Sequence, residues 1–240
     1  MRGVEKFIPL LSSEPDNSVG FGRLEQFFYK ERVVKSPLTV LVVEDNSGHM
    51  EDCRTMLKEV CPKLSIEVMV VEATNLKEAF ELLPQADVVM TDVFFPTRTG
   101  MSADEPNGMT VVEECLYHSK PVVWVTSTYH HGHKTESVSG WGRSRGLEMF
   151  DCNPSHPDGE APHKPWKKAF VGLLFLTLAF EVGCCKVEDK KLVGLADSYP
   201  GNWANEVASG YLKEGRSWVL EEELYKDSIL PLFLALNIPR

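Results

Sequence analysis

The sequence predicts an α/β fold in which a doubly wound parallel sheet carries helices on both faces. Residues 38–93 alternate strand-like and helix-like segments in the order strand, helix, strand, helix, strand. This alternation favours right-handed crossovers and parallel pairing. The strand-like runs are continuously apolar, which is typical of strands buried on both faces. The length of 240 residues is enough to bury a full core.

The first half of this pattern has clear boundaries. The predicted strands are residues 39–43, 66–71 and 86–91, and the predicted helices between them are residues 50–61 and 76–83. Asn46 or Ser47 can cap the first helix and Asn75 the second, because such side chains accept hydrogen bonds from free backbone amides at a helix start. Pro62 and Pro84 are expected to end these two helices.

The second half is less regular. Two polar stretches, residues 96–107 and 127–146, are predicted to be loops. The remaining predicted elements are a helix over 109–117, a strand over 121–126, a weak fifth strand over 146–152 and a helix over 165–185. The last helix is apolar on nearly every side, so more than one of its faces must be covered. Its apolar run, residues 169–180, is shorter than the roughly 20 residues that span a bilayer.

The chain is expected to divide into three parts. Residues 1–37 form an N-terminal arm, residues 38–155 the α/β domain, and residues 156–240 a helical C-terminal extension that packs on the domain. Within the extension, further helices are predicted over residues 203–212, 220–225 and 229–236. The apolar helix over 165–185 permits a homodimer contact as readily as an intrachain cover.

Composition and charge narrow the function classes. The chain has 35 acidic against 25 basic residues and a net charge of -10, which argues against nucleic acid as the main partner. The six cysteines show no regular spacing, and the N-terminal residues lack a signal-peptide pattern. The sequence therefore predicts a cytoplasmic protein that binds neither nucleic acid nor a membrane.

Three of the strand-like runs end in a carboxylate or a hydroxyl. Glu44 and Asp45 follow the first strand, and Asp92 follows the third. Thr126 and Ser127 follow the fourth. Because the carboxyl ends of parallel strands converge on one crevice, we expect these side chains to meet. Carboxylate oxygens are the ligands that Mg²⁺ prefers, so the three acids are predicted to bind that ion.

In these residues the chain resembles the receiver domain of two-component response regulators. That family has an acidic pair after the first strand, a phospho-accepting aspartate after the third, and a threonine or serine after the fourth. Glu44-Asp45, Asp92 and Thr126 match these positions. The resemblance covers residues 38–155 and implies a five-stranded sheet in the order 2-1-3-4-5.

The resemblance also implies a chemical role for each residue. Asp92 would accept the phosphoryl group, and Thr126 would bind one of its oxygens. Glu44, Asp45, Asp92 and the backbone carbonyl of Phe94 would hold Mg²⁺, which neutralises charge on the transferring group. The phosphoryl donor would be a histidine kinase or a phosphotransfer protein. The signal would pass to a protein partner through the long loops or the C-terminal helices.

Two further positions match the family, and one departs from it. Asn107-Gly108 is similar to the glycine turn before the third helix, and Phe150 falls where the family has its switch aromatic. The lysine that precedes a proline after the fifth strand in the family is missing here, and Asn153, followed by Pro154, aligns with its position. The basic residues of the preceding loop that could replace its charge are Lys134, Arg143 and Arg145.

Three other hypotheses follow from the same residues. The first is a pseudo-receiver, a scaffold that binds a protein partner without phosphorylation. The second is a Mg²⁺-dependent phosphohydrolase with Asp92 as nucleophile, but such an enzyme needs an acid two residues later, where this chain has Phe94. The third is a zinc site, although the spacing of its candidate ligands fits no closed zinc site. These candidates are His130, His131, His133, Cys152, His156 and His163.

Overall fold

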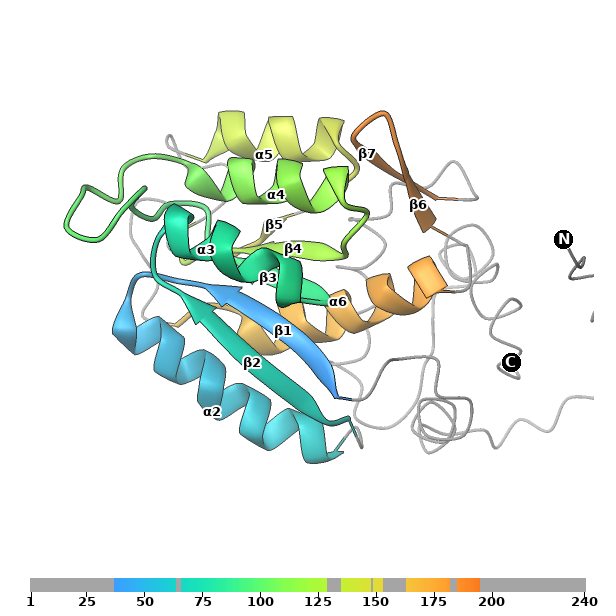
Figure 1. Cartoon of the computed structure of the whole chain (residues 1–240), viewed down its shortest axis with the longest axis horizontal. Helices are drawn as coiled ribbons and strands as arrows, with labels where there is room; N and C mark the ends of the chain where they lie inside the picture. The colour runs from blue at the N-terminus through green and yellow to red at the C-terminus, as the bar shows by residue number, and fades with distance from the viewer. Residues whose placement is uncertain are drawn as a thin grey trace, which may run out of the picture.

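The computed structural model of the chain describes residues 37–63, 66–128, 135–147, 149–152, 163–181 and 185–194. Five of the described strands are parallel and form one sheet in the order β2-β1-β3-β4-β5 (Figure 1). These strands are β1 (Leu38–Val43), β2 (Val68–Ala73), β3 (Val88–Thr91), β4 (Val122–Val125) and β5 (Met149–Phe150). The predicted fold class and strand order are confirmed.

Helices cover both faces of this sheet. The described helices are α2 (Ser47–Lys63), α3 (Leu76–Leu82), α4 (Asn107–Tyr117), α5 (Glu136–Ser144) and α6 (Trp166–Glu181). Figure 1 shows α2 and α6 on one face and α3, α4 and α5 on the other. This arrangement is the doubly wound pattern that the strand-helix alternation predicts.

Strand β1 lies near the centre of the sheet, and its sequence reflects that place. All six of its residues are buried. It pairs in parallel with β2 on one side and β3 on the other, so that Val43 lies opposite both Ala73 and Thr91. A strand with neighbours on both edges and helices on both faces has no exposed position for a polar side chain, which explains the continuous apolar run.

Side-chain caps fix the starts of α2 and α3. Asn46 Oδ1 accepts hydrogen bonds from the backbone amides of Gly48 and His49, at 2.9 and 3.2 Å. Asn75 Oδ1 accepts one from the amide of Glu78, at 3.0 Å. Asn46 is therefore the cap of the first helix, one of the two candidates in the sequence.

Helix α5 lies where a polar loop was predicted. The sequence interpretation was wrong because this segment contains Gly140 and Gly142, and glycine has low helix propensity. Packing offsets that propensity. A Cβ at Gly142 would lie 2.5 Å from the ring of Trp124 on β4, so only glycine lets the helix approach the sheet this closely. The rings of Trp124 and Trp141 stack with centroids 5.5 Å apart.

The chain after α6 also differs from the prediction. The helix ends at Glu181, and an antiparallel hairpin follows, made of β6 (Cys185–Glu188) and β7 (Lys191–Gly194). Its two turn residues, Asp189 and Lys190, both have positive φ, as a two-residue turn of type I′ requires. Neither is glycine or asparagine, so the sequence carries only a weak hairpin signal.

The hairpin packs against the end of α5. The amide of Leu192 donates to the carbonyl of Arg145 at 2.8 Å, and the Leu192 side chain is buried. Gly146 has φ +80°, and a Cβ there would lie 2.0 Å from the Leu192 carbonyl oxygen. Figure 1 shows the hairpin beside one end of α5.

The hydrophobic core continues past residue 155, the predicted end of the α/β domain. Phe170, Leu173 and Leu174 of α6 are buried in the same cluster as the central strands. None of the described helices is long and apolar enough to cross a membrane. The predicted arm, apart from Pro37, and the predicted helices at 203–212, 220–225 and 229–236 lie outside the described residues.

Candidate functional site

The acidic residues lie where the central strands end. Glu44 directly follows β1, and its amide donates to the carbonyl of Ala73 at 2.9 Å. Asp92 directly follows β3, and its amide donates to the carbonyl of Val43 at 2.8 Å. One carboxylate oxygen from each of Glu44, Asp45 and Asp92 lies within 4.8 Å of the others. The three predicted metal ligands are therefore brought together.

A lysine that the sequence interpretation did not include joins two of these acids. Lys164 Nζ lies 2.5 Å from Glu44 Oε2 and 2.7 Å from Asp92 Oδ2. The side chains of Lys164 and Glu44 are each only 1% exposed, so this contact is shielded from water. Hydrogen bonds that join charged groups are about twice as strong as neutral ones. The ammonium therefore holds the two strand-end carboxylates together.

The expectation that the chain lacks a lysine at this site is wrong. Lys164 is followed by Pro165, the dipeptide that the resembled family has after its fifth strand. The sequence interpretation missed Lys164 because this lysine lies 14 residues after Phe150. Asn153-Pro154 stands at the spacing from the fifth strand that is usual in the family. Asn153 lies outside the described residues. The signal that could have found Lys164 is the later Lys-Pro pair directly before an apolar helix.

The basic residues considered as replacements have other partners. Arg143 Nη2 donates to Ser139 Oγ at 3.1 Å within α5. Arg145 Nη2 lies 3.7 Å from a carboxylate oxygen of Glu113. Lys134 lies outside the described residues.

Burial controls the ionisation of this cluster. Desolvation raises the pKa of Glu44 to about 7, because the attraction of Lys164 only partly offsets it and the charge of Asp92 adds to it. Desolvation likewise raises the pKa of Asp92, again opposed by Lys164. Burial alone would lower the pKa of Lys164, but the carboxylates of Asp92 and Glu44 raise it above its ordinary value. One buried ammonium thus does not fully balance the two buried acids.

The backbone around Asp92 is tightly packed. Asp92 Oδ1 accepts a hydrogen bond from the Val93 amide at 2.7 Å, while Oδ2 faces Lys164. The amide of Gly108, at the start of α4, donates to the Val93 carbonyl at 3.0 Å. A Cβ at Gly108 would lie only 2.2 Å from the Asp92 carbonyl oxygen. The Asn107-Gly108 turn therefore holds α4 directly against the candidate acceptor.

Lys164 is itself held from both sides. The Trp166 amide, at the start of α6, donates to the Lys164 carbonyl at 2.8 Å. His163 Nδ1 lies 2.8 Å from Asp52 Oδ2 on α2. Cys152 Sγ, which follows β5, donates to the His163 carbonyl at 3.3 Å. The lysine is thus fixed by contacts to the elements on either side of the crevice.

Thr126 and Phe94 lie in the loops at the same edge of the sheet. Thr126 follows β4, its amide donates to the Phe150 carbonyl at 3.0 Å, and its hydroxyl lies 2.9 Å from that of Thr128. Phe94 follows Asp92 by two residues and is half-buried. The roles of the Thr126 hydroxyl and the Phe94 carbonyl stay predictions.

The acidic cluster fits a small hard cation. Its donors are carboxylate oxygens, which suit Mg²⁺, and Asp45 is exposed to solvent, which suits an ion that keeps several waters. The raised pKa of Glu44 and of Asp92 indicates that further positive charge would be accepted there. Glu44, Asp45 and Asp92 are the residues that would hold the ion.

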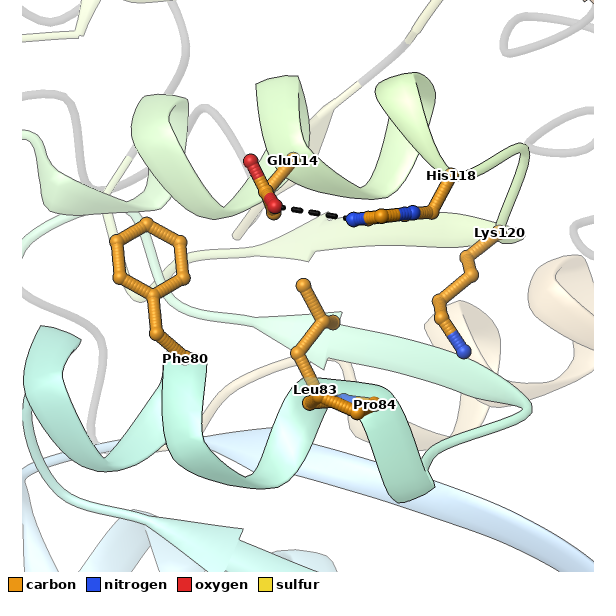
Figure 2. Close-up of a pocket in the computed structure, with 6 residues that line it drawn as sticks. All are labelled: Phe80, Leu83, Pro84, Glu114, His118 and Lys120. Atoms are coloured by element: carbon orange, nitrogen blue, oxygen red, sulfur yellow. Dashed lines mark hydrogen bonds and ion pairs between the residues drawn. The ribbon is translucent and has the colours of Figure 1, made fainter.

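A separate hollow lies between α3 and α4, near the residues that precede β3 rather than those that follow it (Figure 2). It is lined by Phe80, Leu83, Pro84, Glu114, His118 and Lys120. Lys120 Nζ donates to the carbonyl of Ala86, which precedes β3, whereas Asp92 follows that strand. This hollow is therefore distinct from the acidic site.

Comparison of the chain with models of known protein families, with curated proteins and with solved structures finds no match. The acidic site is therefore interpreted from its own residues and geometry.

Proposed function

We propose that this protein is an atypical response-regulator receiver that binds Mg²⁺ and accepts a phosphoryl group on Asp92. The donor would be the phosphohistidine of a histidine kinase or a phosphotransfer protein. The signal would then pass to a protein partner through direct contacts. A cytoplasmic location belongs to this proposal.

The observation that carries the proposal is the pair of contacts made by Lys164. Its ammonium reaches Glu44 and Asp92 at once, beside the exposed carboxylate of Asp45. Three acids and one lysine at the carboxyl edge of a parallel sheet form the set of charges that phosphoryl transfer to an aspartate requires. The sequence pattern had predicted the three acids of this set but not the lysine.

Each residue has a part in the proposed transfer. A carboxylate oxygen of Asp92 attacks phosphorus, the P–N bond of the phosphohistidine breaks, and the released imidazole takes up a proton from solvent. Lys164, already 2.7 Å from Asp92 Oδ2, would pair with an oxygen of the arriving group, and Thr126 would donate to another. Mg²⁺, when bound by the three acids, supplies the remaining charge neutralisation.

The second candidate function is a pseudo-receiver that binds a protein partner without phosphorylation. One observation favours it. Glu44 already accepts hydrogen bonds from Lys164 at 2.5 Å and from the Asn46 amide at 3.0 Å, so the cluster holds together with protein partners alone. In this function the site would be a structural ion pair, and phosphate mimics would have no effect.

The deciding experiment compares the full chain with Asp92→Asn. Purified protein is titrated with Mg²⁺ and then with beryllofluoride, while tryptophan fluorescence is followed. Incubation with acetyl phosphate, followed by intact-mass measurement and hydroxylamine treatment, detects an acyl phosphate. We expect a saturable Mg²⁺ response, a further beryllofluoride response and one hydroxylamine-labile phosphoryl group, the last two lost in Asp92→Asn.

Asp104→Asn is the matched control, because Asp104 is an exposed aspartate in the loop between β3 and α4. It should behave like the unaltered chain. Retained labelling of Asp92→Asn would reject Asp92 as the acceptor. Mg²⁺ binding without any response to the mimic or to acetyl phosphate would favour the pseudo-receiver.

A further inference from the structure

An apolar groove runs between α2 and the edge strand β2, with a volume of about 760 Å³. Its floor combines Leu57 and Cys61 of α2 with Val68 and Val70 of β2, and Ile66 lines the end before the strand. The groove lies outside the acidic site, and the proposed function gives it no role. Charged side chains surround this apolar floor, namely Arg54, Lys58, Glu67 and Glu72.

Among the described strands, β2 forms one edge of the sheet, because β1 is the only one of them that pairs with it. Half of the backbone groups of an edge strand face away from the sheet and are open to pairing with another chain. The side chains of β2 are mostly half-buried, and Met69 is 50% exposed. An apolar edge of this kind promotes aggregation unless it is covered.

Charged residues close one end of the groove. Arg54 on α2 bonds Glu72 of β2 through two hydrogen bonds, at 2.7 and 2.6 Å. Both residues line the groove near the end of β2. The opposite end, near Ile66 and Glu67, is where an extended segment would enter.

The chain itself arrives at this entrance. The Leu38 amide, at the start of β1, donates to the carbonyl of Glu67 at 2.9 Å. Glu67 lines the groove. The first residue of β1 therefore lies beside a residue that lines the groove.

Within the residues that precede β1, large apolar side chains concentrate over 21–29. The sequence there is Phe-Gly-Arg-Leu-Glu-Gln-Phe-Phe-Tyr, with four aromatic residues. The eight residues between Tyr29 and Leu38 can span at most about 30 Å when extended. The six residues of β2 rise about 20 Å, so the segment can reach any point of the groove.

We propose that residues 21–29 of the same chain cover this groove. Their aromatic side chains pack on Leu57, Val68 and Val70, and their backbone shields the open edge of β2. The run 7–11 is a less favourable occupant, because closing a longer loop has a greater entropic cost. A second copy of the chain is the main competitor, and concentration dependence separates it from the arm.

Hydrogen exchange of the full chain tests this proposal. Phe27→Asp with Phe28→Asp should make peptides that cover residues 66–73 exchange at least about tenfold faster, because the edge amides lose their cover. Phe7→Asp, a matched change outside the segment, should leave that exchange unaltered. Peptides of β3 report whether the sheet remains folded in each variant. Unaltered exchange over 66–73 in the double variant would overturn the proposal.

Zero-length carbodiimide cross-linking of the unaltered chain gives a second readout that needs no mutation. Lys58 and Glu67 line the groove, and Glu25 and Lys30 lie in or beside the segment. Cross-links from Glu25 to Lys58 or from Lys30 to Glu67 should appear in the monomer fraction and persist on dilution. Their absence, or their restriction to a dimer fraction, would assign the groove to another occupant.

Discussion

Two buried carboxylates and one buried ammonium share the crevice at the ends of β1 and β3. A buried charge is tolerated only when it is paired and hydrogen-bonded. Lys164 meets this condition through Glu44 and Asp92, and Asp92 also accepts from the Val93 amide. When both carboxyls are ionised, the two carboxylates and one ammonium carry a net charge of minus one. We therefore expect the site to respond to pH and to added cations.

The ionisation of Glu44 should appear as a pH dependence of stability. Its pKa is about 7 in the folded chain and near 4.5 when exposed. The folded state therefore binds the extra proton, and the free energy of unfolding falls as pH rises from about 4.5 to about 7. Glu44→Gln should remove the contribution of Glu44 to this fall, a difference between pH 5 and pH 8 on the order of 1 to 3 kcal/mol.

Urea unfolding at pH 5 and pH 8 measures this difference. Glu81→Gln is the control, because Glu81 is an exposed acid on α3, paired only loosely with Lys77 at 3.6 Å. It should keep the pH dependence of the unaltered chain. If Glu44→Gln also keeps it, the carboxyl of Glu44 is not the group that titrates.

At the level of whole elements, the placement of α4 depends on the missing side chain at Gly108. The helix begins directly over the end of β3, where the Gly108 amide bonds the Val93 carbonyl. Trp124 Nε1 of β4 donates to the Gly108 carbonyl at 3.2 Å. The helix start is thus joined to two strands at the edge that carries Asp92.

Substitution of two helical glycines by alanine should have opposite effects. In Gly108→Ala the new methyl would lie 2.2 Å from the Asp92 carbonyl oxygen, so backbone must move. We expect a loss of about 1 to 3 kcal/mol of unfolding free energy, as for overpacked cores. In Gly140→Ala on α5 nothing lies within 4 Å, so the better helix propensity should add about 0.5 to 1 kcal/mol.

Thermal and urea unfolding of the two variants measure these changes. The same substitution in the two helices separates the effect of space from the effect of propensity. A Gly108→Ala variant as stable as the unaltered chain would mean that α4 does not rest on the end of β3 as closely as described.

The elements differ in how far the sequence could predict them. The three strands and two helices of residues 38–93 were predicted because caps and apolar runs agree there with the tertiary fold. Helix α5 was not, because its two glycines are favoured by packing on Trp124 rather than by local propensity. The β6–β7 hairpin was not, because its turn uses Asp189 and Lys190 at positive φ, where glycine or asparagine is the usual signal.

The candidate site divides in the same way. Glu44, Asp45 and Asp92 follow apolar strands directly, so strand topology alone brings them together. Lys164, in contrast, does not directly follow a strand. No local sequence pattern limits how many residues separate it from β5. Only the packing of α6 on the sheet places it there, and this could not be read from spacing.

For the whole molecule, Lys164 connects parts of the chain that lie far apart in sequence. Its contact with Glu44 spans 120 residues and joins the first strand of the sheet to the start of α6. Removing one partner of a buried ion pair usually costs about 3 to 5 kcal/mol, because the other charge stays buried. The stability of the entire domain should therefore depend on this one ammonium.

Lys164→Met should make folding strongly dependent on Mg²⁺. Without Mg²⁺ at pH 8 we expect a loss of about 3 kcal/mol, because Glu44 and Asp92 then lie buried without a counter-charge. An ion that binds only the folded state adds about 2.7 kcal/mol at a concentration 100 times its dissociation constant. Mg²⁺ should thus restore more stability to Lys164→Met than to the unaltered chain, because the buried carboxylates of Lys164→Met have lost the ammonium that pairs with them.

Urea unfolding at pH 8 with and without Mg²⁺ measures this coupling. Lys167→Met is the matched control, because Lys167 is exposed on α6, three residues after Lys164, and it should unfold like the unaltered chain in both conditions. At pH 5 the loss in Lys164→Met should shrink, because Glu44 can then take up a proton instead of remaining charged. An equal gain from Mg²⁺ in all three proteins would mean that the ion acts elsewhere and that the acidic cluster is a structural ion pair alone.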